Sequence, residues 1–166
     1  MIEKNRELRN TSLLRRLGPI VVLVTVLAVG LSGCAFFSPG SSASGRAAAK
    51  TAHKYIGVPY KLGGKNPKEG FDCSSLVQYS YARNGVKLPR SSAQQAKVGR
   101  KVKKSQLQPG DLVFFSTGRR GRVSHVGIYV GNDKFIHAPG RGKKVTKASL
   151  SSKYFTKTYH SARRVG

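Results

Sequence analysis

The sequence of 166 residues is poor in several residue types, and each shortage excludes a class of protein. It has two cysteines, one methionine and no tryptophan. Two cysteines form at most one disulfide, so the chain is not a small disulfide-stabilised scaffold. No apolar run reaches the roughly 20 residues that span a bilayer. Hydrophobic residues nevertheless make up 39% of the chain, which excludes a disordered chain and predicts one globular domain.

Acidic residues are also scarce. Six Asp and Glu stand against 31 Lys and Arg, which gives a net charge of +25. A charge of this size favours anionic partners, namely nucleic acid, phospholipid head groups or an acidic polymer.

The N-terminal 33 residues have the pattern of an export signal. Basic residues precede an apolar run at positions 20–31, and Ser32, Gly33 and Cys34 follow. This order of a positive head, a short apolar core and small residues is typical of a secretory signal. Leu31-Ser32-Gly33-Cys34 also resembles the bacterial lipoprotein signal, which implies cleavage before Cys34 and lipidation of its thiol. We therefore expect a signal peptide at 1–33, a lipidated tether at 34–46 and a folded domain at 47–166.

Export narrows the range of partners. After removal of residues 1–33 the chain keeps 26 basic and 4 acidic residues, a net charge of +22. An exported protein does not meet genomic nucleic acid, so we expect peptidoglycan, anionic lipids or other anionic wall polymers as partners, and a membrane reached through Cys34. A charge that serves solubility alone is the alternative.

The order of expected elements predicts an α+β fold, with N-terminal helices packed on a central antiparallel β-sheet. Helical spacing covers 46–56, and a second helix runs from Cys73 to Asn84, with Asp72 as N-cap and Gly85 as stop. Strands are expected at 112–115, 123–130 and 134–137 and within 154–165, with a hairpin turn at 131–133.

Cys73 is a candidate nucleophile. Once Cys34 carries lipid, Cys73 is a lone thiol in an exported protein, and a buried core cysteine is the alternative interpretation. Its predicted place at a helix N-terminus favours reactivity, because the helix dipole lowers the pKa of a thiol there. Asp72, as the cap, partly opposes this effect.

Two histidines are candidates for the groups that deprotonate the Cys73 thiol. Alternation along 123–130 puts His125 and Gly127 on one face and the apolar Val126 and Ile128 on the other. If the hairpin turns at 131–133, His137 lies on the face of His125, about 5 to 8 Å away. The pattern predicts His125 as general base and acid for Cys73 and His137 as the group that orients His125. No zinc-ligand spacing or phosphate-binding loop is present, and no cofactor or metal is expected.

Five sequence blocks stand in a fixed order between residues 47 and 165. The blocks are Tyr60-Lys-Leu-Gly-Gly64, Phe71-Asp-Cys-Ser-Ser-Leu-Val-Gln78, Leu107-Gln-Pro-Gly-Asp-Leu-Val-Phe-Phe115, Ser124-His-Val-Gly-Ile-Tyr-Val-Gly131 and Phe135-Ile-His-Ala138. Together they resemble the NlpC family of bacterial cell-wall cysteine peptidases. The resemblance implies a papain-like fold and a thiol endopeptidase that cuts the peptide stems of peptidoglycan, either between γ-linked D-glutamate and the following diamino acid or at a cross-link.

The resemblance also implies further site residues. Tyr60 matches a family tyrosine that lines the site and stabilises the oxyanion with the backbone N–H of Cys73. Asp72, Ser74 and Ser75 flank the nucleophile and are expected at the substrate or oxyanion site. Leu62 departs from the aromatic residue that many members carry before the paired glycines. A noncatalytic wall- or membrane-binding module and a related thiol amidase or acyltransferase are the alternative functions.

Overall fold

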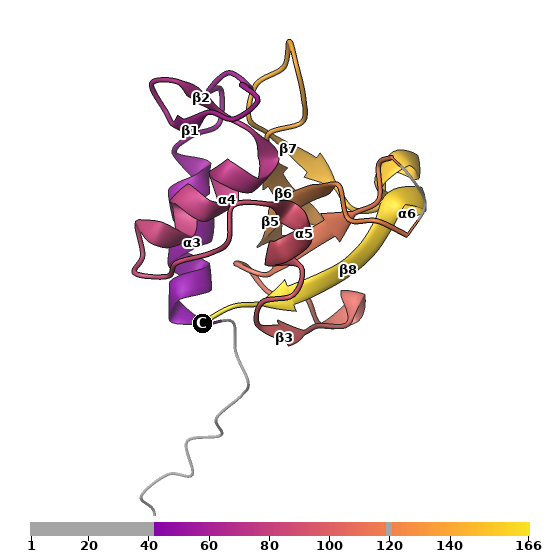
Figure 1. Cartoon of the computed structure of the whole chain (residues 1–166). Helices are drawn as coiled ribbons and strands as arrows, with labels where there is room; N and C mark the ends of the chain where they lie inside the picture. Colours follow the sequence, from indigo (N-terminus) through magenta and orange to yellow (C-terminus); the bar gives the residue numbers. More distant parts are fainter. Residues whose placement is uncertain (1–41, 119–120) are drawn as a thin grey trace, which may run out of the picture. The chain divides into compact units, whose positions relative to one another are not determined.

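The N-terminal part of the domain is helical and the C-terminal part forms a sheet (Figure 1). The computed structural model describes residues 42–118 and 121–166. Helices α3 (Ala43–His53) and α4 (Cys73–Ala82) pack on a six-stranded antiparallel sheet of order β3-β8-β4-β5-β6-β7. The strands are β3 (Arg100–Lys101), β4 (Leu112–Phe115), β5 (His125–Gly131), β6 (Lys134–His137), β7 (Thr146–Ser149) and β8 (Tyr159–Arg164). The expected α+β class is confirmed.

Several short elements were not predicted. A two-stranded ribbon of β1 (Lys65–Asn66) and β2 (Gly70–Phe71) lies in the segment expected to be a loop. Helices α5 (Ser92–Gln95) and α6 (Lys153–Thr158) and the 3-10 helix η1 (Lys104–Gln106) span one or two turns each. Strand β7 is polar, and β3 has two residues, so neither carries an apolar alternation. Within the described ranges, no helix is long and apolar enough to cross a bilayer.

Helix α3 begins earlier than predicted. Residues 43–46, which were assigned to the tether, form its first turn, and the helix ends at His53 instead of residue 56. Ser42 is the N-cap, because its Oγ accepts the Gly45 N–H at 2.9 Å and donates to the carbonyl of Val165 at 2.6 Å. These bonds join the start of α3 to the C-terminus, which lies beside it in Figure 1.

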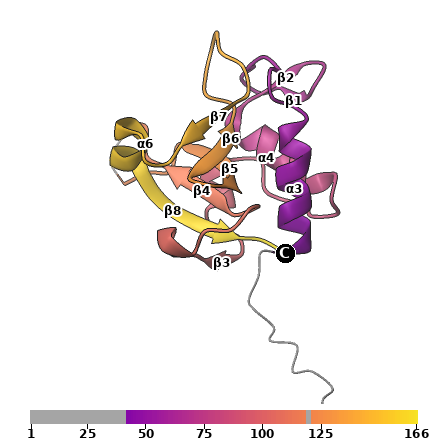
Figure 2. The same cartoon turned by 180° about the vertical axis from the view of Figure 1, so that it is seen from behind.

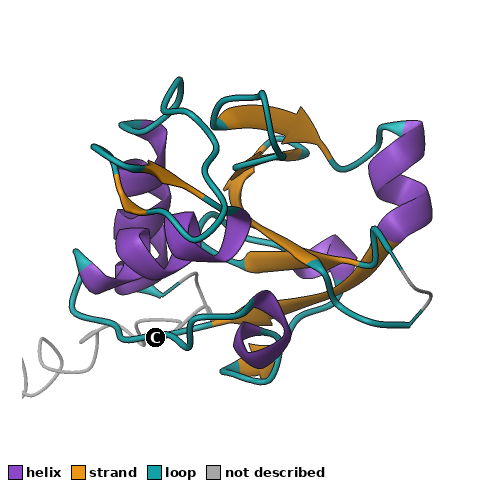
Figure 3. Ribbon diagram, turned by 45° about the horizontal axis from the view of Figure 1, so that its top comes forward, coloured by secondary structure: helices purple, strands orange, loops and turns teal. Residues whose placement is uncertain are grey.

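Each face of the sheet carries a packed hydrophobic cluster. Figure 3 shows the helices that lie beside the strands. Val126 and Ile128 of β5 face α3 and α4, as the alternation predicted. The opposite face is also covered, by a cluster in which Phe115 and Phe135 pack with Phe155 of α6. His125, next to Phe115 on that face, is therefore buried between a strand and an aromatic wall.

The hairpin between β5 and β6 sets the position of the histidines. The turn uses Gly131, Asn132 and Asp133, all with positive φ, as the predicted turn at 131–133 requires. Ile128 pairs with Ile136 and Tyr129 with Phe135. His137 consequently lies on the face of His125, as predicted. Gly127 is required between them, because a Cβ there would lie 2.4 Å from the Phe135 ring.

Candidate active site

The start of helix α4 is fixed by a complete capping box. The Asp72 carboxylate accepts the Ser75 N–H at 2.8 Å, and Ser75 Oγ accepts the Asp72 N–H at 2.9 Å. Asp72 and Ser75 are both buried. The predicted cap is confirmed, and it places Cys73 in the first turn of the helix, which ends at Ala82, two residues before the predicted end.

Arg90 joins this cap from outside the helix. Its guanidinium donates to both Asp72 carboxylate oxygens, at 3.1 and 2.5 Å, and to Ser74 Oγ at 2.9 Å. The Gly63 N–H also donates to Asp72 at 3.1 Å. Burial disfavours the charged carboxylate, but the bonds from Arg90, Ser75 and Gly63 outweigh it and hold the pKa of Asp72 below its ordinary value. Sequence reasoning missed Arg90, which follows Cys73 by 17 positions and is one of many cations.

Asp72, Ser74 and Ser75 hold the start of helix α4. All three are buried, and their side-chain polar atoms bond within the cap, to Arg90 or to the Gly63 N–H. An acid at a buried N-cap needs the donors that the first turn offers. Their expected place at the substrate or oxyanion site stays a prediction.

The Cys73 sulfur lies between helix α4 and strand β5. The backbone N–H groups of Val126, Ser74 and Cys73 itself favour its thiolate. Burial is the larger effect, and with the nearby Asp72 charge it raises the pKa of the thiol above its ordinary value. The expected lowering by the helix dipole is thus outweighed, and the thiol needs a base to ionise. Val126 directly follows His125, so the strand whose backbone contacts the sulfur also carries the candidate base.

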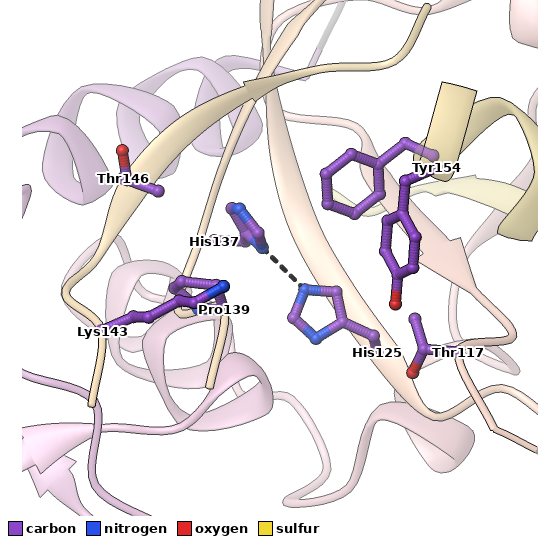
Figure 4. Close-up of a pocket in the computed structure, with 8 residues that line it drawn as sticks. Thr117, His125, His137, Pro139, Lys143, Thr146 and Tyr154 are labelled. Atoms are coloured by element: carbon purple, nitrogen blue, oxygen red, sulfur yellow. Dashed lines mark hydrogen bonds between the residues drawn. The ribbon is translucent and has the colours of Figure 1, made fainter. Parts of the chain in front are cut away.

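His125 and His137 form a direct hydrogen bond. His125 Nε2 and His137 Nδ1 are 2.8 Å apart, and the rings are nearly perpendicular, at 83° (Figure 4). Phe115, Phe135 and Phe155 pack around the two rings. The predicted pairing is present, and it leaves Nδ1 of His125 as the ring nitrogen available for proton exchange.

Both imidazoles are held neutral. Burial lowers the pKa of His125 to about 4. The pKa of His137 is lowered to about 3. Burial is the largest cause, and the nearby charges of His125 and of the Lys143 ammonium add to it. A neutral pair shares one proton in the bond, so when His125 donates from Nε2, its Nδ1 carries a lone pair. That tautomer is the one a general base requires.

Tyr60 lies close to the start of α4. Burial raises the pKa of its hydroxyl, and the charges of Cys73 and Asp72 add to the effect. Its backbone N–H donates to Lys143 O at 2.8 Å, which fixes it to the β6–β7 loop. Leu62, where an aromatic residue was expected, is 72% exposed. The structure thus brings Tyr60 to the thiol, while Cys34 lies outside the described residues.

The described residues do not hold a cluster of three or more His, Cys, Asp or Glu suited to a metal ion. The polar groups that the structure shows instead are the hydrogen-bonded imidazoles of His125 and His137 and the backbone donors at the Cys73 sulfur. This is an arrangement that can move a proton from a thiol and stabilise an anion.

The comparison with known proteins assigns the chain to a family. The NlpC/P60 family profile matches residues 57–164, more than half of the sequence, and the chain belongs to this family. It is 49% identical over 114 residues to the gamma-DL-glutamyl hydrolase of Bacillus subtilis, covering 68% of this chain and 27% of that protein. It is 44% identical over 113 residues to the murein DD-endopeptidase MepH of Escherichia coli, covering 66% and 42%.

The fold is shared with solved members. The NlpC/p60 domain of the peptidoglycan hydrolase SagA superposes with a TM-score of 0.64 at 36% identity, covering 73% of this chain and 98% of that domain. The chain thus matches a domain that accounts for less than half the length of the two relatives above.

Proposed function

We propose that the protein is a peptidoglycan hydrolase, a thiol endopeptidase that cuts the stem peptides of the bacterial cell wall. The observation that carries the proposal is the 2.8 Å bond between His125 Nε2 and His137 Nδ1, with Cys73 held against the same strand. The names of the two relatives support the substrate, since one is a gamma-DL-glutamyl hydrolase and the other a murein DD-endopeptidase.

In the proposed mechanism, His125 Nδ1 takes the proton of the Cys73 thiol as the sulfur attacks the peptide carbonyl. The backbone N–H of Cys73 and the Tyr60 hydroxyl stabilise the oxyanion. His125 then gives the proton to the leaving amine, and a thioester remains on Cys73. Water, activated by His125, hydrolyses the thioester. Throughout, His137 Nδ1 accepts the Nε2 proton of His125 and keeps the tautomer.

Incubation with purified peptidoglycan and with soluble stem peptides tests the proposal. Mass spectrometry of the products identifies the bond, because cleavage after γ-linked D-glutamate and cleavage of a cross-link release fragments of different mass. Protein whose thiol has been alkylated is the control. Intact substrate in both samples, with folded protein and a reduced thiol in the untreated one, would favour a noncatalytic binding module.

The pH dependence of the reaction follows from the neutral imidazoles. Protonated His125 cannot accept the thiol proton, so kcat/KM falls as the pH drops through the pKa of His125, about 4. We expect nearly full kcat/KM at pH 5.5, where an ordinary histidine with a pKa of about 6.5 is mostly protonated. Initial rates from pH 3.5 to 8, with circular dichroism at each pH, measure this. An acid limb centred near 6.5 would contradict it.

Arg90 is proposed as a positioning residue. Arg90→Gln leaves the Asp72 carboxylate, 8% exposed, without its cation. Because the Arg90 side chain is 39% exposed, we expect a modest loss of stability, about 1 to 2 kcal/mol. The unbalanced Asp72 charge also raises the pKa of the Cys73 thiol, and one pKa unit corresponds to about a tenfold lower thiolate fraction.

Alkylation rates of Cys73 across pH separate the two effects of Arg90. We expect the rate profile of Arg90→Gln to move to higher pH and that of Arg90→Lys to lie between it and the wild type. Lys87→Gln, which removes an exposed charge, is the matched control. Unchanged profiles with lowered stability would leave Arg90 a structural residue alone.

We also propose that the protein is exported and anchored to the envelope by lipid on Cys34. The signal pattern of residues 1–34 supports this, and the charge of +22 on the remainder favours contact with anionic lipid or wall polymers. The mass of the protein purified from membranes is expected to include the lipid and to lack residues 1–33. A Cys34→Ser variant is expected in the soluble fraction or with an uncleaved signal.

A further inference from the structure

Five cations gather around strand β3. Lys97 precedes the strand, Arg100 and Lys101 form it, Lys103 caps η1 and Lys104 begins it. All five side chains are exposed, and the sequence has no Asp or Glu between positions 73 and 110. We call this group the β3 surface. It shares no residue with the proposed catalytic site or with the cavity beside the histidines.

The positive charge of the β3 surface is not neutralised by acids. Within residues 42–118 and 121–166 the ion pairs are Arg90 with Asp72 and Arg164 with Asp111, and neither uses a cation of this surface. Asp111 is 1% exposed, and its two oxygens accept from Arg164 at 2.6 and 2.7 Å. The surface therefore presents five unneutralised charges, which favour an anionic partner.

The β3 surface lies at the end of the domain where the N-terminal segment joins it. Ser42 Oγ donates to Val165 O at 2.6 Å, and the residue before Val165, Arg164, pairs with Arg100. Paired strands are about 5 Å apart, so β3 lies one strand spacing from the contact with Ser42. Figures 1 and 2 both show β3 and the C-terminus at one end of the domain and β1 and β2, which lead to Cys73, at the other.

The length of the N-terminal segment limits how far this end can lie from a membrane. Cys34 and Ser42 are eight residues apart in the sequence. Eight residues span at most about 29 Å, whatever their conformation. A lipid on Cys34 would therefore hold the end that carries β3 close to the bilayer. Cations there can reach the head groups, because charges interact over about 8 Å at physiological salt.

A hollow of about 320 Å³ adjoins the cations of the β3 surface. Its lining includes Arg100, Ser105, Gln106 and Arg164, and none of the described residues that line it is acidic. Because Arg164 is bound to Asp111, Arg100 is the lining cation that a ligand can reach. An arginine binds phosphate through two N–H donors at once. The hollow is thus suited to a single phosphate group.

We propose that the β3 surface docks on anionic phospholipid head groups, with one head-group phosphate in the hollow at Arg100. The inference rests on the lipid anchor proposed for Cys34, because that anchor makes a membrane, and not a wall polymer, the anion closest to β3. Each cation that reaches the head groups strengthens binding about fivefold. Docking at this end directs the opposite end, with Cys73, away from the bilayer and toward the wall.

Vesicle binding by an unlipidated chain tests the β3 surface separately from the anchor. Residues 39–166 form one compact unit that contains both hydrophobic clusters, so a chain of residues 35–166 keeps the folded domain and lacks Cys34. We expect this chain to sediment with vesicles of phosphatidylcholine and phosphatidylglycerol and not with vesicles of phosphatidylcholine alone. The binding is expected to weaken as the salt concentration rises.

Neutralising the β3 surface is expected to remove this binding. A variant that combines Arg100→Gln, Lys101→Gln, Lys103→Gln and Lys104→Gln is expected to bind the anionic vesicles at least about fiftyfold more weakly. Arg100→Lys alone keeps the charge but loses the paired donors, and we expect about threefold weaker binding. Unchanged binding by Arg100→Lys would overturn the place of the phosphate in the hollow.

The matched control removes four charges from the opposite end of the domain. Lys54, Lys61, Lys65 and Lys68 are exposed, at the end of α3 or around β1 and β2. Their replacement by glutamine is expected to change vesicle binding by less than about threefold. Melting temperatures show whether both variants are folded. An equal loss of binding in the two variants would mean that net charge alone attracts the vesicles, and it would overturn the inference.

Amine labelling of the same chain without substitutions gives a second measurement. Anionic vesicles are expected to protect Lys101, Lys103 and Lys104 from the reagent and to leave Lys65 and Lys68 as reactive as before. Equal protection of all five would overturn the inference.

Two further outcomes separate the partners and the proposals. Binding to soluble polyphosphate without binding to anionic vesicles would assign the β3 surface to a wall polymer and overturn the lipid partner. Vesicle binding by residues 35–166, with no lipid found on Cys34 of the cellular protein, would keep the surface and refute the anchor. A lipid on Cys34 without vesicle binding by residues 35–166 would keep the anchor and overturn the surface.

Discussion

Replacing Cys73 by alanine is expected to abolish hydrolysis of the stem peptide, with a fall in kcat of at least about a thousandfold. The proposed route passes through a thioester on this sulfur, and without it only the unassisted attack of water is left. Cys73→Ser is expected to be nearly as inactive, because a hydroxyl is far less acidic than a thiol and His125, with a pKa of about 4, is a weak base for it. Product release measured by chromatography gives both values.

The fold of these variants is expected to survive. The capping box that starts α4 uses Asp72 and Ser75 and does not involve the sulfur. Alanine is also favourable in a helix. A melting temperature within a few degrees of the wild type, together with lost activity, would assign the loss to chemistry. Activity within tenfold of the wild type in Cys73→Ala would exclude the thiol as nucleophile.

Local rules explain why much of the site could be predicted from the sequence. The cap at Asp72 and the turn at 131–133 each depend on a few adjacent residues, and both are confirmed. The meeting of His125 and His137 follows from the period of two in a strand and the length of the turn. None of these three features depends on a contact between distant parts of the chain.

Long-range pairing could not be predicted. Two ion pairs show this: Arg90 binds Asp72, and the buried Arg164 binds Asp111. In each pair the cation lies far from the acid in the sequence and is one of 31 basic residues. The acid alone shows that a cation is needed but not which one. The prediction that the pKa of the Cys73 thiol is lowered was wrong for a similar reason. Burial of Cys73 against β5 raises that pKa, and burial is a tertiary effect that the helix dipole argument omits.

The unpredicted elements have a common cause. Strand β7, Thr-Lys-Ala-Ser, lies at the edge of the sheet and is half-exposed, so it needs no apolar alternation. Helix α6 spans six residues and is held by packing of Phe155 on the sheet. Both contribute residues to the cavity beside the histidines, which is why that cavity could not be predicted from the sequence.

Replacing His125 by alanine is expected to lower kcat/KM at pH 7 by about a thousandfold, within the range for loss of a general base. The pH dependence of the residual activity is the more specific test. Because burial raises the pKa of the Cys73 thiol, solvent must remove its proton in the variant, and the rate is expected to rise about tenfold per pH unit up to that pKa. The wild type is expected to be nearly flat over this range.

His160→Ala is the matched control, since His160 is exposed on β8 and bonds to Ser161, and it is expected to keep full activity. A double variant of Cys73→Ala and His125→Ala is expected to be no less active than Cys73→Ala alone, because a base without its nucleophile accelerates nothing. A residual rate in His125→Ala with the pH profile of the wild type would mean that another group deprotonates the thiol. In that case the bond between His125 and His137 would serve the packing of β5 and β6 alone.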